Sequence, residues 1–360
     1  MSPTAEGRTD PRFVQHLLEL DYAFSREDEG EDAAFYAAPR FVSHLDETAL
    51  STVERLIEGL VTEKAPAILD LMASTDSHLP ATLKPSRVTG LGMNAEELRG
   101  NPDLTEWIVQ DLNSDPVLPF EDSTFDAVLN VVSVEYLTQP ERVFAEAARV
   151  LKQGGLFLVV FSNRWFPPKV VRVWDEAKEE ERLGLVEEFF KRTQAFENSD
   201  FFISMGLPRP EGDQYFPLGV PSDPVFAVFA EKKGVRPGRR PRCLFSDPAQ
   251  LERDEGEVRD RKMDVGKTME CPHCQQRLSK WEVPDDPCID WPNDHLYLCF
   301  NDSCPFVVRG WRHMWNQGIA GVSYRFLFNP ATGACNTVPI RSLVDLRPGI
   351  VEEAVERVGG

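Results

Sequence analysis

The chain has 360 residues, of which 42% are hydrophobic, and it carries a net charge of −20. This length favours two or three domains over a single small one. The acidic charge argues against non-specific binding to nucleic acid or to an anionic membrane surface, because phosphate groups would repel the chain. The start of the chain lacks the pattern of a signal peptide, and its apolar runs are too short to span a bilayer. We therefore expect a cytoplasmic protein with no membrane segment.

Residues 1–34 are a charged segment to which the sequence assigns no chemistry, and residues 35–231 are the first predicted domain. Asp46 is the expected N-cap of a helix that carries an apolar residue every three or four positions. His44, just before this helix, is a candidate to face a bound cofactor, although an ordinary loop position also fits it.

Short apolar runs alternate with helical patterns over the middle of the chain. The runs that we interpret as strands are Ala67–Leu71, Val88–Leu91, Trp107–Val109, Phe125–Val132 and Leu156–Val160. Such alternation is typical of an α/β domain with a parallel sheet, and ligands bind at the carboxyl ends of its strands.

Two stretches in this region resemble class I S-adenosylmethionine-dependent methyltransferases. They are VQDLNSDPVLPFEDSTFDAVLNVVSVEYL and RVFAEAARVLKQGGLFLVVFSN, and PRFVSHLDETAL upstream is similar to a methyltransferase-like subgroup of plants and cyanobacteria. The resemblance implies a Rossmann-like methyltransferase fold with a mostly parallel seven-stranded sheet. Its sixth and seventh strands would be Asp200–Ser204 and Val225–Ala230, the seventh antiparallel.

The loop after the first strand departs from the family. Relatives have D-x-G-x-G-x-G there, and glycine lets the backbone lie against the ligand. This chain keeps Asp70 but continues with Met72–Ser77, which contains no glycine. Ala73 and Ser74 are the expected cofactor contacts, with serine and threonine hydroxyls replacing backbone contacts. The alternatives are that Asp76 meets the methionine ammonium, that Asp76 or Ser77 caps a following helix, or that the site has lost its cofactor.

Three further cofactor positions follow from the resemblance. Gly92 stands where relatives usually have an acid that binds the ribose, so Asn94 is the candidate to bind one ribose hydroxyl. Asp111 and Leu112 would bind the adenine through a carboxylate and a backbone N–H. Asn130 lies at the carboxyl end of the fourth strand, near the point of methyl transfer.

The remaining polar residues of this domain give candidates for the substrate side. Glu135, Tyr136, Arg164 and Trp165 follow the fourth and fifth strands, but no residue stands out as catalytic. Thr138 and Glu141 have the spacing of a capping box. The pair Gly154-Gly155 is expected to end the helix that the box begins. The capping box and the glycine pair are thus expected to stabilise the fold and to take no part in the chemistry.

Residues 232–267 are the predicted linker and residues 268–360 a second, β-rich domain. Most of the seven cysteines lie in this domain, which in a cytosolic chain favours metal binding over disulfides. The pairs Cys271/Cys274 and Cys299/Cys304 predict a tetrahedral, structural Zn²⁺ site in what looks like a zinc-ribbon-type module. Strands 324–328 and 334–340 are expected to form a hairpin.

The leading hypothesis is a methyltransferase that uses S-adenosylmethionine, carries Zn²⁺ and acts on a small-molecule acceptor that the sequence does not identify. The alternative is an inactive methyltransferase-fold protein, a binding or scaffold protein whose zinc module holds a protein partner. A nucleic-acid-binding zinc protein fits the acidic charge poorly.

Overall fold

A computed structural model of the chain describes residues 11–234, 248–284, 293–302, 304–317, 319 and 322–351. The described residues up to 234 form one compact unit, and those from 248 onward form a second. We call them the N-terminal unit and the C-terminal unit and describe each by itself.

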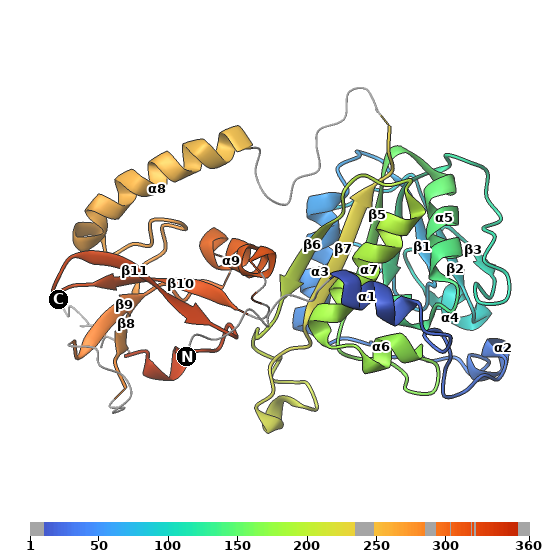
Figure 1. Ribbon diagram of the computed structural model, residues 1–360, viewed down its shortest axis with the longest axis horizontal. Coiled ribbons are helices and arrows are strands. Elements are labelled where there is room, and N and C mark those ends of the chain that lie inside the picture. The colour runs from blue at the N-terminus through green and yellow to red at the C-terminus, as the bar shows by residue number, and fades with distance from the viewer. Residues whose placement is uncertain are drawn as a thin grey trace, which may run out of the picture. The chain divides into compact units, whose positions relative to one another are not determined.

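A seven-stranded sheet in the order β3-β2-β1-β4-β5-β7-β6 is the centre of the N-terminal unit (Figure 1). The first five strands pair in parallel, whereas β7 pairs antiparallel with both β5 and β6. The strands are β1 (Ala67–Leu71), β2 (Arg87–Gly92), β3 (Glu106–Val109), β4 (Phe125–Val131), β5 (Leu151–Phe161), β6 (Asp200–Ser204) and β7 (Val225–Glu231). The mostly parallel seven-stranded sheet that the resemblance implies is therefore confirmed, including its antiparallel seventh strand.

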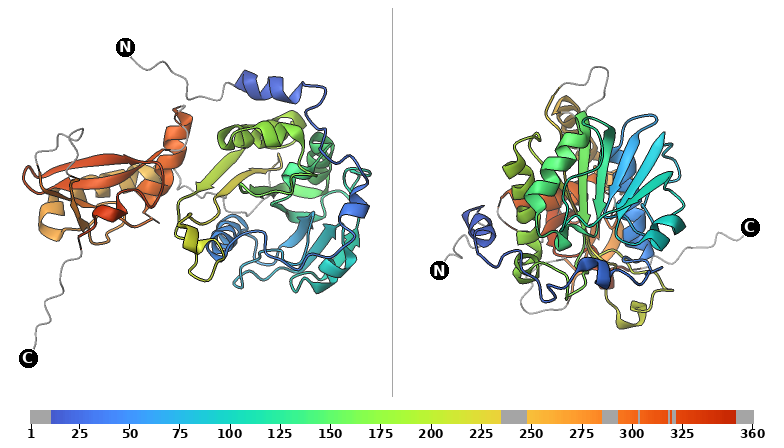
Figure 2. Two further views of the ribbon diagram at one scale, coloured as in Figure 1. Left: turned by 90° about the horizontal axis from the view of Figure 1, so that it is seen from below. Right: turned by 90° about the vertical axis from the view of Figure 1, so that its right-hand side faces the viewer.

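Helices cover both faces of this sheet. The helices are α1 (Pro11–Leu18), α2 (Asp32–Phe35), α3 (Glu47–Leu60), α4 (Ala95–Gly100), α5 (Pro140–Val150), α6 (Arg172–Glu176) and α7 (Glu179–Thr193), with 3-10 turns η1 (Val134–Tyr136) and η2 (Phe216–Leu218). The predicted apolar stripe of α3 packs on one face against side chains of β1, β4, β5 and β7. Helices α5 and α7 lie on the other face (Figure 2). There, aromatic rings of α5, α7 and β5 pack edge to face. This two-sided cover explains the continuous apolar runs of the central strands.

Two predicted helix boundaries are wrong. Gln139 is the N-cap of α5, and the Thr138 hydroxyl donates to Asn113 Oδ1 at 3.1 Å, because this distant amide competes with the local cap. Gly154-Gly155 lies inside β5, since the preceding helix already ends at Val150. By contrast, the predicted N-cap is confirmed: Asp46 accepts hydrogen bonds from the backbone N–H groups of residues 48 and 49.

The segment between β1 and β2 contains no helix. Residues 72–86 form turns and irregular structure, so the alternative in which Asp76 or Ser77 begins a helix is wrong. Asp76 instead accepts the N–H of His78 at 2.7 Å, a local turn that holds His78 at a positive φ of 55°. The chain therefore passes from the loop into β2 directly.

The C-terminal unit has a four-stranded sheet in the order β11-β10-β9-β8. Its elements are α8 (Pro248–Thr268), β8 (Ser279–Glu282), β9 (His295–Leu298), α9 (Pro305–Asn316), β10 (Ser323–Asn329), β11 (Ala334–Ile340) and the 3-10 turn η3 (Arg347–Gly349). The predicted hairpin is β10 with β11, paired antiparallel from Ser323↔Ile340 to Asn329↔Ala334. Helix α8 begins inside the range that the sequence predicts as a linker. The sequence also predicts a short helix over residues 350–358, of which residues 352–358 lie outside the described part of the chain.

Among the described helices, none combines the length and the apolar character needed to cross a membrane.

Candidate active site and metal centre

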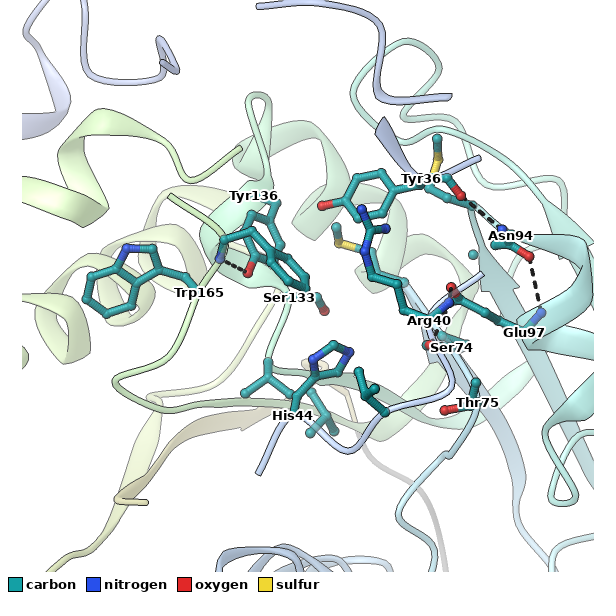
Figure 3. A pocket seen from close by; sticks show the side chains of 18 of the residues that line it. Tyr36, Arg40, His44, Ser74, Thr75, Asn94, Glu97, Ser133, Tyr136 and Trp165 are labelled. Atoms are coloured by element: carbon teal, nitrogen blue, oxygen red, sulfur yellow. Dashed lines mark hydrogen bonds between the residues drawn. The ribbon is translucent and has the colours of Figure 1, made fainter. Parts of the chain in front are cut away.

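The carboxyl ends of the parallel strands border a cavity of about 1110 Å³ (Figure 3). This volume slightly exceeds the roughly 300–1,000 Å³ of ordinary small-molecule pockets. Its walls come from the loops after β1 to β5, from the N-terminal segment and from the loop before β7. The lining residues include Asp70, Ala73, Ser74, Asn94, Asp111 and Leu112. Six of the seven predicted cofactor positions therefore face one space.

Internal hydrogen bonds fix the glycine-free loop. Asp70 is buried, and its carboxylate accepts the Ser77 hydroxyl at 2.7 Å. Burial raises the pKa of Asp70 to about 6. Met72 turns the loop at a φ of 64°, and the Ser74 hydroxyl donates to Glu97 Oε2 at 2.7 Å. Two of the hydroxyls proposed as replacements for glycine thus donate to carboxylates of the protein.

The absence of an acid at the end of β2 has a structural cause in the glycine-free loop. The Ala73 N–H donates to the Leu91 carbonyl at 2.8 Å, so the loop continues to pair with β2. This pairing presses the Ala73 carbonyl against the Cα of Gly92, where a Cβ would collide with it. Any residue other than glycine at position 92 would displace the loop backbone.

Asn94 connects α4 to the N-terminal segment. Its Oδ1 caps the helix by accepting the N–H groups of Glu96 and Glu97, at 2.9 and 3.2 Å. Its Nδ2 donates to the carbonyls of Tyr36 and Ala37, at 2.9 and 3.1 Å. Both ends of the amide thus bind backbone groups; its predicted role toward a ribose hydroxyl stays a prediction.

Glu97, in the first turn of α4, is a cavity residue that the sequence does not single out. Its carboxylate is buried, and Oε1 accepts the Arg40 N–H at 2.6 Å while Oε2 accepts Ser74. It therefore joins the N-terminal segment to the loop after β1. The bond to Arg40 spans 57 residues, so no local pattern could have revealed it.

The loop after β3 places Asp111 and Leu112 in the cavity wall. The Asp111 carboxylate accepts the Asn113 N–H at 2.9 Å, and Leu112 is buried. Asp111 thus lines the cavity, and its predicted contact with an adenine stays a prediction.

Asn130, the remaining predicted cofactor residue, lies behind the wall. It is 1% exposed, and its Nδ2 donates to the Leu71 carbonyl at 3.2 Å, joining β4 to β1. Its Oδ1 has no hydrogen-bond partner among the described residues. In this arrangement its side chain holds the end of β1, where the loop begins, through the hydrogen bond to Leu71.

Aromatic rings form the opposite side of the cavity. The Tyr136 hydroxyl accepts the Phe166 N–H at 2.8 Å, and the two rings stack with centroids 6.0 Å apart. His44 meets Phe166 edge to face at 5.7 Å, and burial lowers the pKa of His44, which favours the neutral imidazole. The Ser133 hydroxyl faces the same space and has no partner among the described residues (Figure 3).

Of the other substrate-side candidates, Arg164 and Trp165 line the cavity but Glu135 does not. Glu135 is 1% exposed, and burial raises its pKa to about 8. Its carboxyl group is enclosed behind Tyr136 rather than presented to a ligand.

Buried charges hold the N-terminal segment over the cavity. Asp32 contacts Arg26 Nη1 at 2.7 Å, Asn113 Nδ2 at 2.9 Å and the fully buried Lys169 Nζ at 3.1 Å. Burial alone would raise the pKa of Asp32, but these three partners hold it below its usual range. Lys169 also donates to the Gly30 carbonyl at 2.7 Å, which ties the segment to the loop after β5.

In the C-terminal unit, the four cysteines that the sequence predicts as zinc ligands lie close together. Their sulfurs all lie within 4.8 Å of one another, with Cys271–Cys304 at 4.0 Å and Cys274–Cys299 at 3.6 Å. A tetrahedral zinc site with Zn–S bonds of about 2.3 Å has S–S edges of about 3.8 Å, so the cluster fits a zinc ion. His273 is not part of this cluster, because its ring stacks on Phe306 at 4.3 Å. Cys288 lies outside the described residues.

Part of the N-terminal unit is similar in sequence to known methyltransferases. Residues 76–159 match the family described as a methyltransferase domain. The chain is 38% identical over 87 residues to a fatty-acid O-methyltransferase of Mycolicibacterium smegmatis, which is 23% of this chain and 31% of that protein. It is 48% identical over 42 residues to the sterol 4-C-methyltransferase strm-1 of Caenorhabditis elegans, 12% of this chain and 13% of that protein. The matches thus span at most about a third of these relatives.

The solved structures to which the chain is similar include an S-adenosylmethionine-dependent methyltransferase from Mesorhizobium loti, 16% identical, with a TM-score of 0.34 over 51% of this chain and 98% of that one. The YcgJ protein from Bacillus subtilis is also 16% identical, with a TM-score of 0.34 over 52% and 99%. The fold assignment itself rests on the strand order and on the family match. The N-terminal unit has the class I S-adenosylmethionine-dependent methyltransferase fold.

Proposed function

We propose that the protein is an S-adenosylmethionine-dependent methyltransferase that acts on a small-molecule acceptor. The observation that carries this proposal is the cavity at the carboxyl ends of β1 to β4, inside a region that matches a methyltransferase domain. Two of the similar proteins have names that describe methyl transfer to a fatty acid and to a sterol, which supports a small-molecule acceptor.

The residues on the cofactor side fit the charge and shape of this ligand. S-adenosylmethionine would supply a methyl group on a positively charged sulfonium. Carboxylates of Asp70, Asp111 and Glu97 line this side of the cavity and favour a cationic ligand. Asp70 would face the methionine end and Asp111 the adenine end, while Ala73 and Ser74 would offer backbone contacts between them.

The chain's own residues would contribute mainly by orienting the two ligands and excluding water, which are the main requirements of a direct methyl transfer. The N-terminal segment, held by Asp32 and Lys169, closes one side of the cavity. The rings of Tyr136 and Phe166 give the acceptor a rigid wall.

Calorimetric titration with S-adenosylhomocysteine is the first test. We expect a dissociation constant in the micromolar range or below, about −8 kcal/mol or better, because the cavity is preformed and its polar loop is fixed. Absence of binding by protein that is folded and zinc-loaded would contradict the proposal and favour the scaffold alternative.

Asp111→Ala is expected to weaken S-adenosylhomocysteine binding about 10- to 100-fold, since a hydrogen bond to a charged group is worth about 1.5–3 kcal/mol. Asp115→Ala is the matched control: its carboxylate lies on the same loop, is exposed and does not line the cavity. Equal affinities of the two variants would show that the adenine end of the pocket lies elsewhere.

We also propose that the four clustered cysteines hold one structural Zn²⁺ and that the C-terminal unit mediates contact with a protein partner. The closed set of four thiolates supports a structural rather than a catalytic metal, because it leaves no coordination position for water or substrate.

A further inference from the structure

The two sides of the cavity differ in chemistry. The side formed by β1 to β3 carries the carboxylates, whereas the side formed by the ends of β4 and β5 is mostly apolar. Its lining residues include Val131, Val132, Tyr136, Trp165, Phe166 and Pro167. Arg164 and Asp175 are already occupied there: Arg164 Nε lies 2.9 Å from Asp223 Oδ1, and Asp175 Oδ1 accepts Trp165 Nε1 at 3.3 Å.

Three polar side chains line the cavity on this side. The Ser133 side chain is nine-tenths buried and has a hydroxyl without a partner among the described residues. The Arg40 guanidinium lies 5.3 Å from the centroid of the Phe166 ring, and its Nη1 has no hydrogen-bond partner among the described residues. The His44 ring faces the same space (Figure 3). A hydroxyl, an imidazole and a guanidinium can together hydrogen-bond one oxygen-containing head group, neutral or anionic.

The rim of the cavity carries exposed hydrophobic side chains. Tyr215 lines the cavity, and Phe216 and Leu218, which follow in η2, are 43% and 71% exposed. Phe41 and Val42 also line it and are 62% and 55% exposed, but Phe41 lies against Gly100 of α4, on the side that carries the carboxylates. Exposed apolar side chains beside a pocket are typical of a surface that an apolar ligand covers.

A buried polar cluster fixes the two parts of the rim to each other. The Asp46 carboxylate accepts the Asp223 N–H at 2.6 Å and the Ser222 hydroxyl at 2.8 Å, while the Asp46 N–H donates back to Asp223 at 3.1 Å. Arg209 Nη2 lies 2.6 Å from Asp223 Oδ1. Segments 41–46 and 209–223 therefore form one structure, and Asp223 pairs with both Arg164 and Arg209.

We infer that the acceptor is a single-chain amphiphile. Its oxygen-containing head binds at Arg40, His44 and Ser133, and its apolar chain leaves the cavity across Tyr215, Phe216 and Leu218. This inference rests on the proposed function and names the class of its acceptor. An anionic membrane surface fits the rim less well, because Arg164 and Arg209 are paired and the chain carries a net charge of −20.

The test is a chain-length series of 1-alkanols and alkanoic acids, from about six to about fourteen carbons, titrated as monomers into the full chain with and without S-adenosylhomocysteine. We expect the affinity to rise about three- to fourfold per methylene until the rim is covered. The two series separate an alcohol head from a carboxylate head. The titration without S-adenosylhomocysteine tests the rim even if the proposed function fails.

Two kinds of variant measure separately how the head group and the alkyl chain of the ligand contribute to affinity. The double variant Phe216→Ser, Leu218→Ser should flatten the dependence on length for the longer members and leave the shortest ones unchanged. Ser133→Ala should weaken all members by the same factor. Val117→Ser is the control, because Val117 is 53% exposed but does not line the cavity.

A double variant with the wild-type length dependence would overturn the inference. So would amphiphiles that fail to bind protein that does bind S-adenosylhomocysteine, and this result would leave the proposed function intact. Rim-dependent binding to neutral lipid vesicles without binding of the monomers would assign the rim to a membrane instead.

Discussion

Cys304→Ser is expected to unfold the C-terminal unit while the N-terminal unit stays folded. Cys304 is fully buried and lies directly before α9, so its thiolate would connect this helix to the turn that carries Cys271 and Cys274. One apolar cluster of the unit contains the buried side chains of Trp281, Leu296, Leu298, Leu327 and Val338, and α9 and β10 add further buried side chains. A structural zinc contributes about 10–16 kcal/mol in small domains, which is comparable to the whole net stability of an ordinary domain, about 5–15 kcal/mol.

Hydrogen exchange read by mass spectrometry checks this result, because it reports each unit separately. Protection should be lost over β8 to β11 in Cys304→Ser and after prolonged chelation, and kept over β1 to β7. Cys335→Ser is the matched control: Cys335 lies on β11 of the same sheet, is partly exposed and stands outside the four-sulfur cluster. Unchanged protection in protein without zinc would show that the unit does not depend on a metal.

The four-cysteine cluster and the sheet were predictable because their signals are local. A CxxC turn brings two sulfurs together by itself, and the second pair lies within one loop. The central strands are buried on both faces, so they stand out as apolar runs. The errors at Thr138 and Gly154 arise where a contact from another element, here Asn113 for Thr138, or the continuation of a strand decides the local structure.

The cofactor side was predicted in position but not in detail. Asp70 and Asp111 line the cavity because the carboxyl ends of parallel strands meet at one edge of the sheet. Glu97 was missed, and Asn130 lies behind the wall, because side-chain direction depends on packing between segments far apart in the sequence. The need for glycine at position 92 comes from a backbone contact, which residue types alone do not reveal.

Gly92→Asp, which introduces the acid that relatives usually have at this position, is expected to destabilise the N-terminal unit and to weaken S-adenosylhomocysteine binding. The new Cβ would meet the Ala73 carbonyl, and backbone cannot move aside as the end of a side chain can. Overpacking of this kind costs about 1–3 kcal/mol and occasionally more, and we expect the upper end. That corresponds to a fall in melting temperature of about 6–12 °C for a unit of this size.

Gly92→Ala should show most of this loss, because the collision is with the Cβ and not with the carboxylate. Gly212→Asp is the matched control for the added charge, since a Cβ at Gly212 meets no atom within 4 Å. The double variant Ala73→Gly, Gly92→Asp returns a glycine to the loop and lets its backbone turn away from position 92. It should therefore recover part of the lost melting temperature. A Gly92→Asp variant that binds more tightly at an unchanged melting temperature would mean that the loop is free to move and that the acid alone was missing.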